Sequence, residues 1–346
     1  MNDHRKNLLV TLADRAYLSA AQQLFASAHL HGGWDGDYML LTPEDVDDSE
    51  LAWFYRQGVV VKKLPIPVHY AGATGFPLTI YLMLHLFTPM VAAWDQVVFI
   101  DADCIVRASL AELSHVPSFS AIRDVLKMKL ADQFRWYFVQ VSSASLYQLS
   151  PVSHLEYKNT YSRLKHEYPL RSPSFNLGVL AFPTSIITDE LLSNLHRIYQ
   201  TYGAIGAFAI QGDLNLLFAE RWHHLPPAYN AFAYYWMSHY GLSRERVDGV
   251  LLHFAGGPKP WETSNPFYPE WKENFDASEN IDLQIFRPAT RIWNTEELEE
   301  HQLFMDTKHF EYTVWFTIDR SLGNLGKAVR WCSPRLYDFI KRLIVG

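Results

Sequence analysis

Two aspartates, Asp101 and Asp103, stand one residue apart directly after an apolar run over residues 97–100. A short run of this kind, apolar throughout, is typical of a buried strand. Because a buried carboxylate is costly unless it is paired or binds a metal, two of them at the end of such a strand favour a divalent cation site. The same pattern also occurs in solvated turns, which is the alternative interpretation of these residues.

A histidine and a lysine further along the chain extend this pattern. His253 follows the apolar residues 250–252, and Gly256, Gly257 and Lys259 come next. An imidazole beside two carboxylates suits a transition ion such as Mn²⁺, with Mg²⁺ as a substitute. Glycines let backbone amides approach an anion closely, and the lysine adds a positive charge. Together these groups would neutralise a departing diphosphate; the alternative is that His253 is a half-buried structural side chain.

Alternating strands and helices must bring these groups together. Apolar runs predict short strands, and apolar residues at helical spacing or acidic first turns predict helices between them. Strands are expected at residues 7–12, 38–41, 59–61, 97–100, 174–182 and 250–252, and helices at 16–30, from Pro43 onward, at 77–89 and at 189–199. This alternation predicts a mostly parallel sheet covered on both faces, in which ligands bind beyond the carboxyl ends of strands.

The composition fits one enlarged α/β domain with a C-terminal appendage. The chain has 346 residues, of which 49% are hydrophobic and 19% charged, as in ordinary soluble globular proteins. A net charge of −7 argues against a surface devoted to nucleic acid, which needs Lys and Arg to neutralise phosphates. The two cysteines, Cys104 and Cys332, predict neither a disulfide framework nor a structural zinc site. With no signal peptide or transmembrane helix expected, the predicted location is cytoplasmic.

Two segments lack this alternation. Residues 126–173 are rich in aromatic residues, Ser and Lys without a clear period, which suits a loop-rich insertion over the site. Residues 326–346 interleave basic and apolar side chains, with Asp338 as the single acid. That pattern permits peripheral contact with a membrane surface, or a packed terminal helix with a basic face. We place the domain boundary at residue 275, so that residues 1–275 form the main domain and 276–346 the appendage.

Five groups of residues, in order along residues 7–261, resemble glycosyltransferase family 8, especially its glycogenin-like members. They are Thr11-Leu12 with Tyr17, Phe99 to Asp103, Phe175 to Val179, Leu214-Asn215 with Leu225-Pro226 and Tyr229-Asn230, and His253 to Trp261. The resemblance implies a GT-A fold, a Rossmann-like mixed sheet covered by helices on both faces. It also implies an enzyme that transfers a hexose from a UDP-sugar, needs manganese and retains the anomeric configuration.

The resemblance also implies roles for single residues. Asp101, Asp103 and His253 fall on the family's metal ligands. Gly256 and Lys259 fall on its contacts to the donor diphosphate, Asp101 and Ala102 fall among its other donor-binding residues, and Thr11, Leu12 and Tyr17 match its nucleoside pocket. Asp124 and Asn176 fall where the family contacts the donor sugar.

The chain departs from the family pattern in one important place. The family has an Asp-Gln pair whose aspartate lies five residues before the equivalent of Asn215, and this chain has Ile210 there, followed by Gln211 and Asp213. Either Gln211 or Asp213 takes the role of that acid, or the donor sugar is handled differently. A basic residue common on the helix before the Asp-X-Asp strand is also absent, and His85 is the nearest polar residue.

Three hypotheses follow about function. The first is a retaining, Mn²⁺-dependent transferase with UDP-glucose or UDP-galactose as donor and a carbohydrate or glycolipid as acceptor. The second is a non-catalytic relative that still binds nucleotide sugar. The third is a haloacid-dehalogenase-like phosphatase, which also places Asp-X-Asp after an apolar strand. Because glycogenins glycosylate their own tyrosine, Tyr234 and Tyr235 are conceivable self-acceptors; the sequence predicts no oligomeric state.

Overall fold

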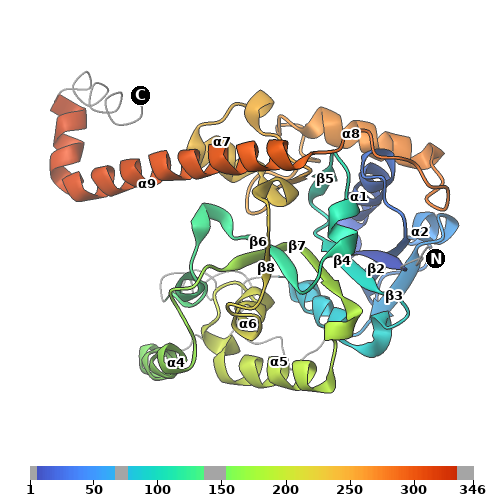
Figure 1. Ribbon diagram of the computed structural model, residues 1–346, viewed down its shortest axis with the longest axis horizontal. Coiled ribbons are helices and arrows are strands. Elements are labelled where there is room, and N and C mark those ends of the chain that lie inside the picture. Colours follow the sequence, from blue (N-terminus) through green and yellow to red (C-terminus); the bar gives the residue numbers. More distant parts are fainter. Residues whose placement is uncertain (1–5, 67–76, 136–152, 333–346) are drawn as a thin grey trace.

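The computed structural model describes residues 6–66, 77–135 and 153–332, and the side chains of the last helix only as far as Thr317. Its centre is a seven-stranded sheet (Figure 1). In spatial order the strands are β3 (Val60–Leu64), β2 (Asp37–Pro43), β1 (Asn7–Leu12), β4 (Gln96–Ile100), β7 (Phe175–Pro183), β6 (Ser120–Arg123) and β8 (His223–Leu225). Only β7 runs antiparallel to its neighbours. The prediction of a mixed, mostly parallel sheet is confirmed.

A smaller sheet lies at the carboxyl end of β4. It contains β5 (Cys104–Val106), β10 (Leu251–His253) and β9 (Ala231–Phe232), with β10 in the middle. β5 follows β4 after the turn that contains the two aspartates, and β10 pairs antiparallel with β5, so that His253 lies opposite Cys104. This pairing brings distant parts of the sequence to one end of the large sheet.

The central strands are apolar throughout because both faces of the sheet are covered. Side chains alternate between faces along a strand. In β1, Leu8 and Val10 join one hydrophobic core, whereas Leu9 joins the other, and all three are fully buried. A continuous apolar run therefore indicates a strand that is buried on two sides.

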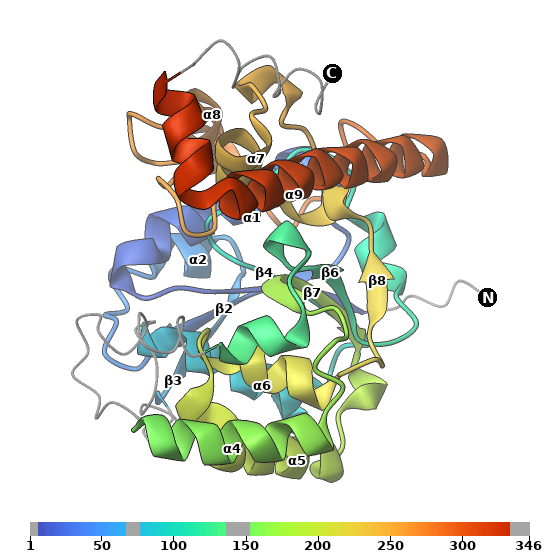
Figure 2. The same ribbon diagram turned by 90° about the vertical axis from the view of Figure 1, so that its left-hand side faces the viewer.

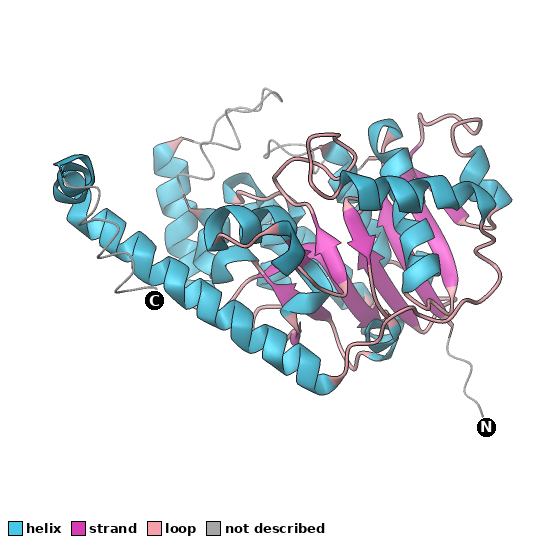
Figure 3. Ribbon diagram, turned by 90° about the horizontal axis from the view of Figure 1, so that it is seen from above, coloured by secondary structure: helices cyan, strands magenta, loops and turns pink. Residues whose placement is uncertain are grey.

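Helices cover both faces, as Figures 2 and 3 show. The first core takes side chains from α5 (Asp189–Tyr202) and α6 (Ile210–Leu217), and α4 (His154–Glu167) lies beside them. The second core takes side chains from α1 (Leu18–His31) and α2 (Ala52–Arg56). The remaining helices are α7 (Ala233–Tyr240), α8 (Tyr268–Ala277), which packs against α1, and α9 (Thr295–Cys332).

Three local predictions need correction. Pro43 does not begin a helix but is the last residue of β2, and α2 begins only at Ala52. Residues 77–89 do not form an α-helix: the segment consists of a 3₁₀ helix, Leu78–Phe87, followed after Thr88 by a second, Pro89–Val91. The region 126–173 contains α4, so it is less loop-rich than predicted, although residues 136–152 lie outside the described ranges.

The chain after α8 packs back on the main body before it forms α9. Trp53 Nε1 donates to the Ser278 carbonyl, Gln57 Nε2 donates to the Ile281 carbonyl, and the Leu283 side chain joins the second core. α9 then runs across the molecule and extends beyond it (Figure 1). The helices of the described ranges include none with the combined length and apolarity that crossing a bilayer requires. Of the basic tail, residues 333–346 lie outside the described residues.

Candidate active site

The end of β4 delivers two carboxylates to one turn. After Ile100 the chain leaves the sheet, and the Asp101 N–H donates to the Gly178 carbonyl of the neighbouring β7 at 2.8 Å. The Cys104 N–H then donates to the Asp101 carbonyl, which closes the turn before β5. Asp103 is 7% exposed, and one third of the Asp101 side chain is exposed.

β10 brings His253 to both aspartates. Its Nε2 lies 3.3 Å from Asp103 Oδ1 and 3.7 Å from Asp101 Oδ2, and the ring is 2% exposed. Adjacent ligands of an octahedral ion held at about 2.1 Å lie roughly 3.0 Å apart. The three side chains therefore converge closely enough for one divalent cation, as the sequence predicted, and their mixed nitrogen and oxygen donors suit such an ion.

Cys104 lies next to this cluster. Its thiol, Asp103 and His253 offer ligand atoms that all lie within 4.8 Å of one another. Burial, followed by the nearby Asp103 and Asp101, raises the pKa of the Cys104 thiol well above its ordinary value. Without a metal the thiol stays protonated, and a metal would have to displace this proton to bind the sulfur. The carboxylate of Asp101 is an oxygen donor, which Mn²⁺ and Mg²⁺ prefer to sulfur.

Lys259 faces the same carboxylates. Its Nζ donates to Asp103 Oδ2 at 2.5 Å and to the Phe254 carbonyl at 3.0 Å. Burial acts to lower the pKa of Lys259, but the Asp103 carboxylate outweighs it, and the net change is upward. The side chain is thus a cation held within reach of any anion beside Asp103.

The two aspartates differ in their electrostatics. Burial and the neighbouring Asp103 raise the pKa of Asp101 above its ordinary value. Burial also acts to raise the pKa of Asp103, but His253 and Lys259 outweigh it and hold that pKa far below its ordinary value. Two negative groups in a buried turn repel each other, and added positive charge relieves this repulsion.

These groups line one end of a cavity of about 360 Å³. Of the predicted site residues, the lining includes Leu12, Tyr17, Asp101, Ala102, Asp103, Asp124, Asn176, Gln211, His253, Gly256 and Lys259. Gly256 has a φ of 66°, a left-handed conformation that favours glycine. Two predicted residues, Thr11 and Asp213, are buried but absent from the lining.

A hydrogen-bond network around Asp124, Asn176 and Gln211 lines another part of the same cavity. Gln211 Nε2 donates to Asp124 Oδ2 at 3.0 Å, and Gln211 Oε1 accepts from Asn176 Nδ2 at 3.2 Å. Gln133, which is fully buried, donates to the same Asp124 oxygen at 2.8 Å. Asp124 is only 5% exposed, and burial raises its pKa to about 6. One carboxyl and three carboxamides therefore meet at one place.

α6 explains the difference between Gln211 and Asp213. Gln211 faces the cavity, whereas Asp213 is 2% exposed and its Oδ1 has no hydrogen-bond partner. Burial raises the pKa of Asp213 well above its ordinary value, which favours the neutral acid. Ile210 is buried in the first core. His85, the polar residue nearest to the missing base, does not line the cavity either.

Three further residues of this region were not predicted from the sequence. Gln133 bridges Asp124 and Ser174 from inside the segment 126–173, where no motif marks it. Asn230, whose Oδ1 lies 2.8 Å from His253 Nδ1, belongs to a quoted motif but received no role. Gly178 lies against the His253 ring, because a Cβ there would come within 2.2 Å of Cε1; its place in the Asn-Leu-Gly motif was the available signal.

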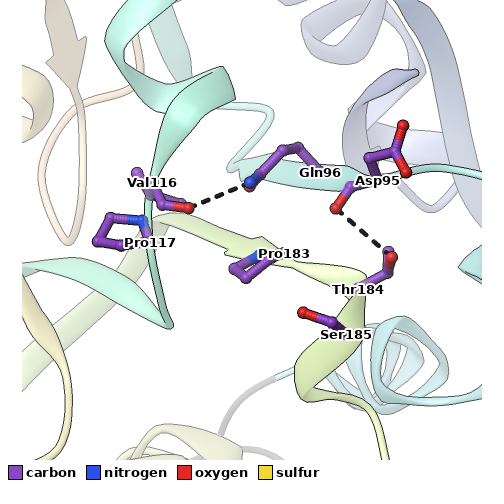
Figure 4. Close-up of a pocket in the computed structure, with 7 residues that line it drawn as sticks. All are labelled: Asp95, Gln96, Val116, Pro117, Pro183, Thr184 and Ser185. Atoms are coloured by element: carbon purple, nitrogen blue, oxygen red, sulfur yellow. Dashed lines mark hydrogen bonds between the residues drawn. The ribbon is translucent and has the colours of Figure 1, made fainter. Parts of the chain in front are cut away.

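The described residues line two other cavities. One of about 390 Å³ is at the opposite end of β4, beside Asp95 and Pro183, where Gln96 donates to the Val116 carbonyl and Thr184 to the Asp95 carbonyl (Figure 4). Another, of about 240 Å³, shares Asp124, Val125 and Phe232 with the main cavity. α9 contributes Gln302 and Asp306 to this cavity of about 240 Å³, which is called the second cavity below.

Comparison with known proteins places this geometry in a family. The family model described as Glycosyl transferase family 8 matches residues 69–265. Galactinol synthase 2 of Arabidopsis thaliana is 23% identical over 274 residues, which are 77% of this chain and 74% of that protein. Glycosyltransferase GlyF of Streptococcus pneumoniae is 22% identical over 331 residues, 88% of this chain and 71% of that protein.

Solved structures agree on the fold. Galactosyltransferase LgtC, in complex with donor and acceptor sugar analogues, superimposes with a TM-score of 0.55 at 17% identity, over 78% of this chain and 95% of that one. The bifunctional glycosyltransferase WbbM gives a TM-score of 0.56 at 19% identity over 88% of this chain, which spans 53% of the length of WbbM. The fold is thus the GT-A type.

The matched region contains β4, β7 and β10, the strands that carry both aspartates, Gly178 and His253. It covers more than half of the 346 residues. The chain therefore belongs to glycosyl transferase family 8, a family of sugar-transferring enzymes.

Proposed function

We propose that this protein transfers a hexose from a UDP-sugar, with glucose or galactose as the sugar, to a carbohydrate or glycolipid acceptor, with retention of configuration. The observation that carries the proposal is the convergence of Asp101, Asp103 and His253 on one point beside Lys259, at the end of a cavity large enough for a ligand. Family membership argues against the phosphatase hypothesis.

The cation end of the cavity would receive the diphosphate. Asp101, Asp103 and His253 would hold Mn²⁺, or Mg²⁺ in its place, and the bound ion would neutralise charge on the departing UDP. Lys259 Nζ lies 2.5 Å from Asp103 Oδ2. Once a metal cation took the place of this ammonium beside Asp103, the ammonium would turn to a phosphate oxygen. Gly256 and Ala102 line the same end, and without a Cβ Gly256 permits close approach of the anion.

The turn after β1 would hold the nucleoside. Leu12 and Tyr17 line the cavity, and the Tyr17 ring rests against Trp261 with its centroid 5.3 Å away. A ring supported in this way offers a surface on which uracil can stack. Thr11 does not line the cavity, so its contribution would come from the backbone of β1.

The part of the cavity around Asp124, Asn176 and Gln211, here called the sugar end, would hold the sugar. Asp124, Asn176 and Gln211 present a carboxyl and two carboxamides, which match the hydroxyl groups of a hexose. Between the two candidates for the missing acid, we favour Gln211, because Asp213 lies outside the cavity. Because residue 210 is isoleucine and not an acid, Asp124 is the acidic side chain among the described residues at the sugar end.

We assign the acceptor to the second cavity. It adjoins the sugar end through Asp124, Val125 and Phe232. Its walls combine the aromatic rings of Trp236 and Tyr240 with polar groups from α9. Aromatic faces and hydrogen-bonding groups together suit a carbohydrate.

Calorimetry of UDP binding with and without Mn²⁺ tests the proposal. Asp101→Asn and Asp103→Asn each keep the size of the side chain but remove the charge, so Mn²⁺-dependent binding should be lost. Asp95→Asn is the matched control, because this exposed aspartate lies at the opposite end of β4 and bonds the Lys6 N–H. Undiminished Mn²⁺-dependent binding by both site variants would contradict the assigned roles.

Turnover separates the enzyme from a non-catalytic relative. Slow hydrolysis of UDP-glucose or UDP-galactose with Mn²⁺ would support transfer, and the anomeric proton signal of the first product would establish retention. Binding of nucleotide without turnover across a panel of donors would instead favour the non-catalytic relative, with Ile210 as the cause.

A further inference from the structure

The imidazole of His253 lies between two hydrogen-bond acceptors. Nε2 faces Asp103 Oδ1 at 3.3 Å, and Nδ1 faces Asn230 Oδ1 at 2.8 Å. A neutral imidazole carries only one proton, and the nitrogen without it is the one that binds a metal. The group that holds the proton on Nδ1 therefore decides whether Nε2 is free to face a cation.

Asn230 holds the proton on His253 Nδ1 only if its side-chain oxygen, and not its amino group, faces the ring. The two ends of a carboxamide have nearly the same shape, so the partners on the far side must fix the orientation. Asn230 Nδ2 lies 3.1 Å from Asn176 Oδ1. The orientation of Asn230 is thus determined by that of Asn176.

Backbone groups fix Asn176 in turn. Asn176 Oδ1 accepts from the Gly178 N–H at 2.8 Å, and a backbone N–H is only ever a donor. On the other side, Asn176 Nδ2 donates to Gln211 Oε1, which also accepts from the Leu177 N–H at 3.2 Å. Two main-chain amides of β7 therefore set the direction of every hydrogen bond as far as the imidazole.

We propose that Asn230 is a positioning residue that holds His253 in the Nδ1–H tautomer, through the chain Gly178 N–H, Asn176, Asn230, His253. Asn230 is fully buried and does not line the cavity, so it acts through His253 and not on the ligand. Partners of this kind on a metal-binding histidine contribute about 10- to 100-fold in metal affinity. The part of the inference that concerns the cation rests on the proposed function.

Leucine and aspartate at position 230 give opposite expectations. Asn230→Leu keeps the branch at Cγ, with bulkier methyl groups, but removes the acceptor, so Asp103 draws the proton to Nε2, and the Kd for Mn²⁺ rises about 10- to 100-fold. Asn230→Asp keeps an acceptor for Nδ1–H and retains most of the affinity. Asn274→Leu is the matched control, because Asn274 is 3% exposed and its Oδ1 lies 3.0 Å from His31 Nε2, on α8 and α1 outside the cavity.

The experiment has two readouts on the full chain. Nitrogen-15 NMR of the metal-free protein reports which ring nitrogen of His253 carries a proton, and Mn²⁺ titration followed by electron paramagnetic resonance reports affinity. We expect Nδ1–H in wild type, Asn230→Asp and Asn274→Leu, and its loss in Asn230→Leu. Thermal unfolding of each variant without metal checks that the fold is retained.

Two results would overturn the inference. The first is that Nδ1 of His253 carries no proton in the wild type, and the second is that Asn230→Leu keeps both the proton on Nδ1 and the Mn²⁺ affinity of the wild type. Weak Mn²⁺ binding by Asn274→Leu, equal to that of Asn230→Leu, would also overturn it, because the loss would then be general. If the wild type binds no Mn²⁺ at all, the proposed function fails, and the proton on Nδ1 still decides the role of Asn230.

Discussion

Gly178 of β7 lies directly beneath the imidazole of His253, so close that a methyl group on residue 178 would come within 2.2 Å of Cε1 and 2.4 Å of Nδ1. The ring is buried and held by Asn230, so it cannot turn away without losing that hydrogen bond. Real Cβ atoms essentially never approach another heavy atom so closely. Glycine at this position is therefore a condition for the arrangement of His253.

Gly178→Ala should displace His253 and weaken Mn²⁺-dependent UDP binding by at least about tenfold, which is the lower end of the effect of disturbing a metal ligand's support. Calorimetry provides the measurement. Gly206→Ala is the control, because a Cβ there meets its nearest atom at an ordinary 3.4 Å. Equal affinities for the two variants would show that the contact with His253 is unimportant.

Asp124→Asn should change how stability depends on pH. Burial raises the pKa of Asp124 to about 6 in the folded protein, from an ordinary value of 3.8. Its contribution to stability is therefore complete below pH 4 or so and is lost as the pH rises through about 6, a change on the order of 3 kcal/mol. Because asparagine does not ionise, the variant should gain stability relative to wild type over this range. A constant difference in melting temperature at every pH would contradict the prediction.

Gln302→Ala should raise the KM for the acceptor about tenfold and leave the KM for the donor unchanged. Gln302 belongs to α9 and lines the second cavity but not the main one. Loss of a hydrogen bond to a bound hydroxyl costs about 1 kcal/mol or somewhat more. Steady-state kinetics with each substrate varied in turn gives both constants; a change confined to the donor would place the acceptor elsewhere.

Phe119→Ala should lower the free energy of unfolding by about 3–5 kcal/mol, because it opens a hole in a buried aromatic cluster. Phe119 is 2% exposed and stacks on Phe218 with ring centroids 3.8 Å apart. Urea denaturation measures the effect. Phe310→Ala on α9 removes a side chain that is 68% exposed and should be nearly neutral. Similar midpoints for the two variants would argue against the packing described.

Deletion of residues 326–346 distinguishes the two interpretations of this segment, contact with a membrane and a packed terminal helix. The segment contains five basic residues, Lys327, Arg330, Arg335, Lys341 and Arg342. Each basic residue near an anionic surface contributes about 1 kcal/mol. If the segment contacts a membrane, sedimentation with anionic liposomes should fall more than tenfold on deletion, whereas neutral liposomes should show no difference. Unchanged sedimentation with anionic liposomes would leave a packed terminal helix as the explanation.

The six strands predicted from apolar runs are present, because such runs are local signals, but β5, β6, β8 and β9, of two to four residues each, were not predicted. The sequence could not reveal that β7 runs against its neighbours, since direction depends on pairing. The helix expected after Pro43 failed because residues 44–51 form turns before Ala52. The capping box of Ser153 and Glu156, which begins α4, was a readable signal that was overlooked.

Part of the candidate site has local sequence signals. Asp101, Asp103, His253 and Lys259 are polar residues at or after the ends of apolar strands, and the structure brings them together. Gln133 and Asn230 act only through partners that are distant in sequence, so nothing in their own neighbourhoods distinguishes them. The choice between Gln211 and Asp213 likewise depended on which face of α6 is turned inward.

The position of β1 has a practical consequence for anyone who dissects this protein. β1 lies between β2 and β4, yet it precedes residue 69, where the family match begins. A fragment limited to residues 69–265 would leave the side of β4 that pairs with β1 without a partner, next to the turn that contains Asp101. An unpaired apolar strand of this kind recruits other chains. Such a fragment is expected to precipitate and to be unsuitable for binding studies.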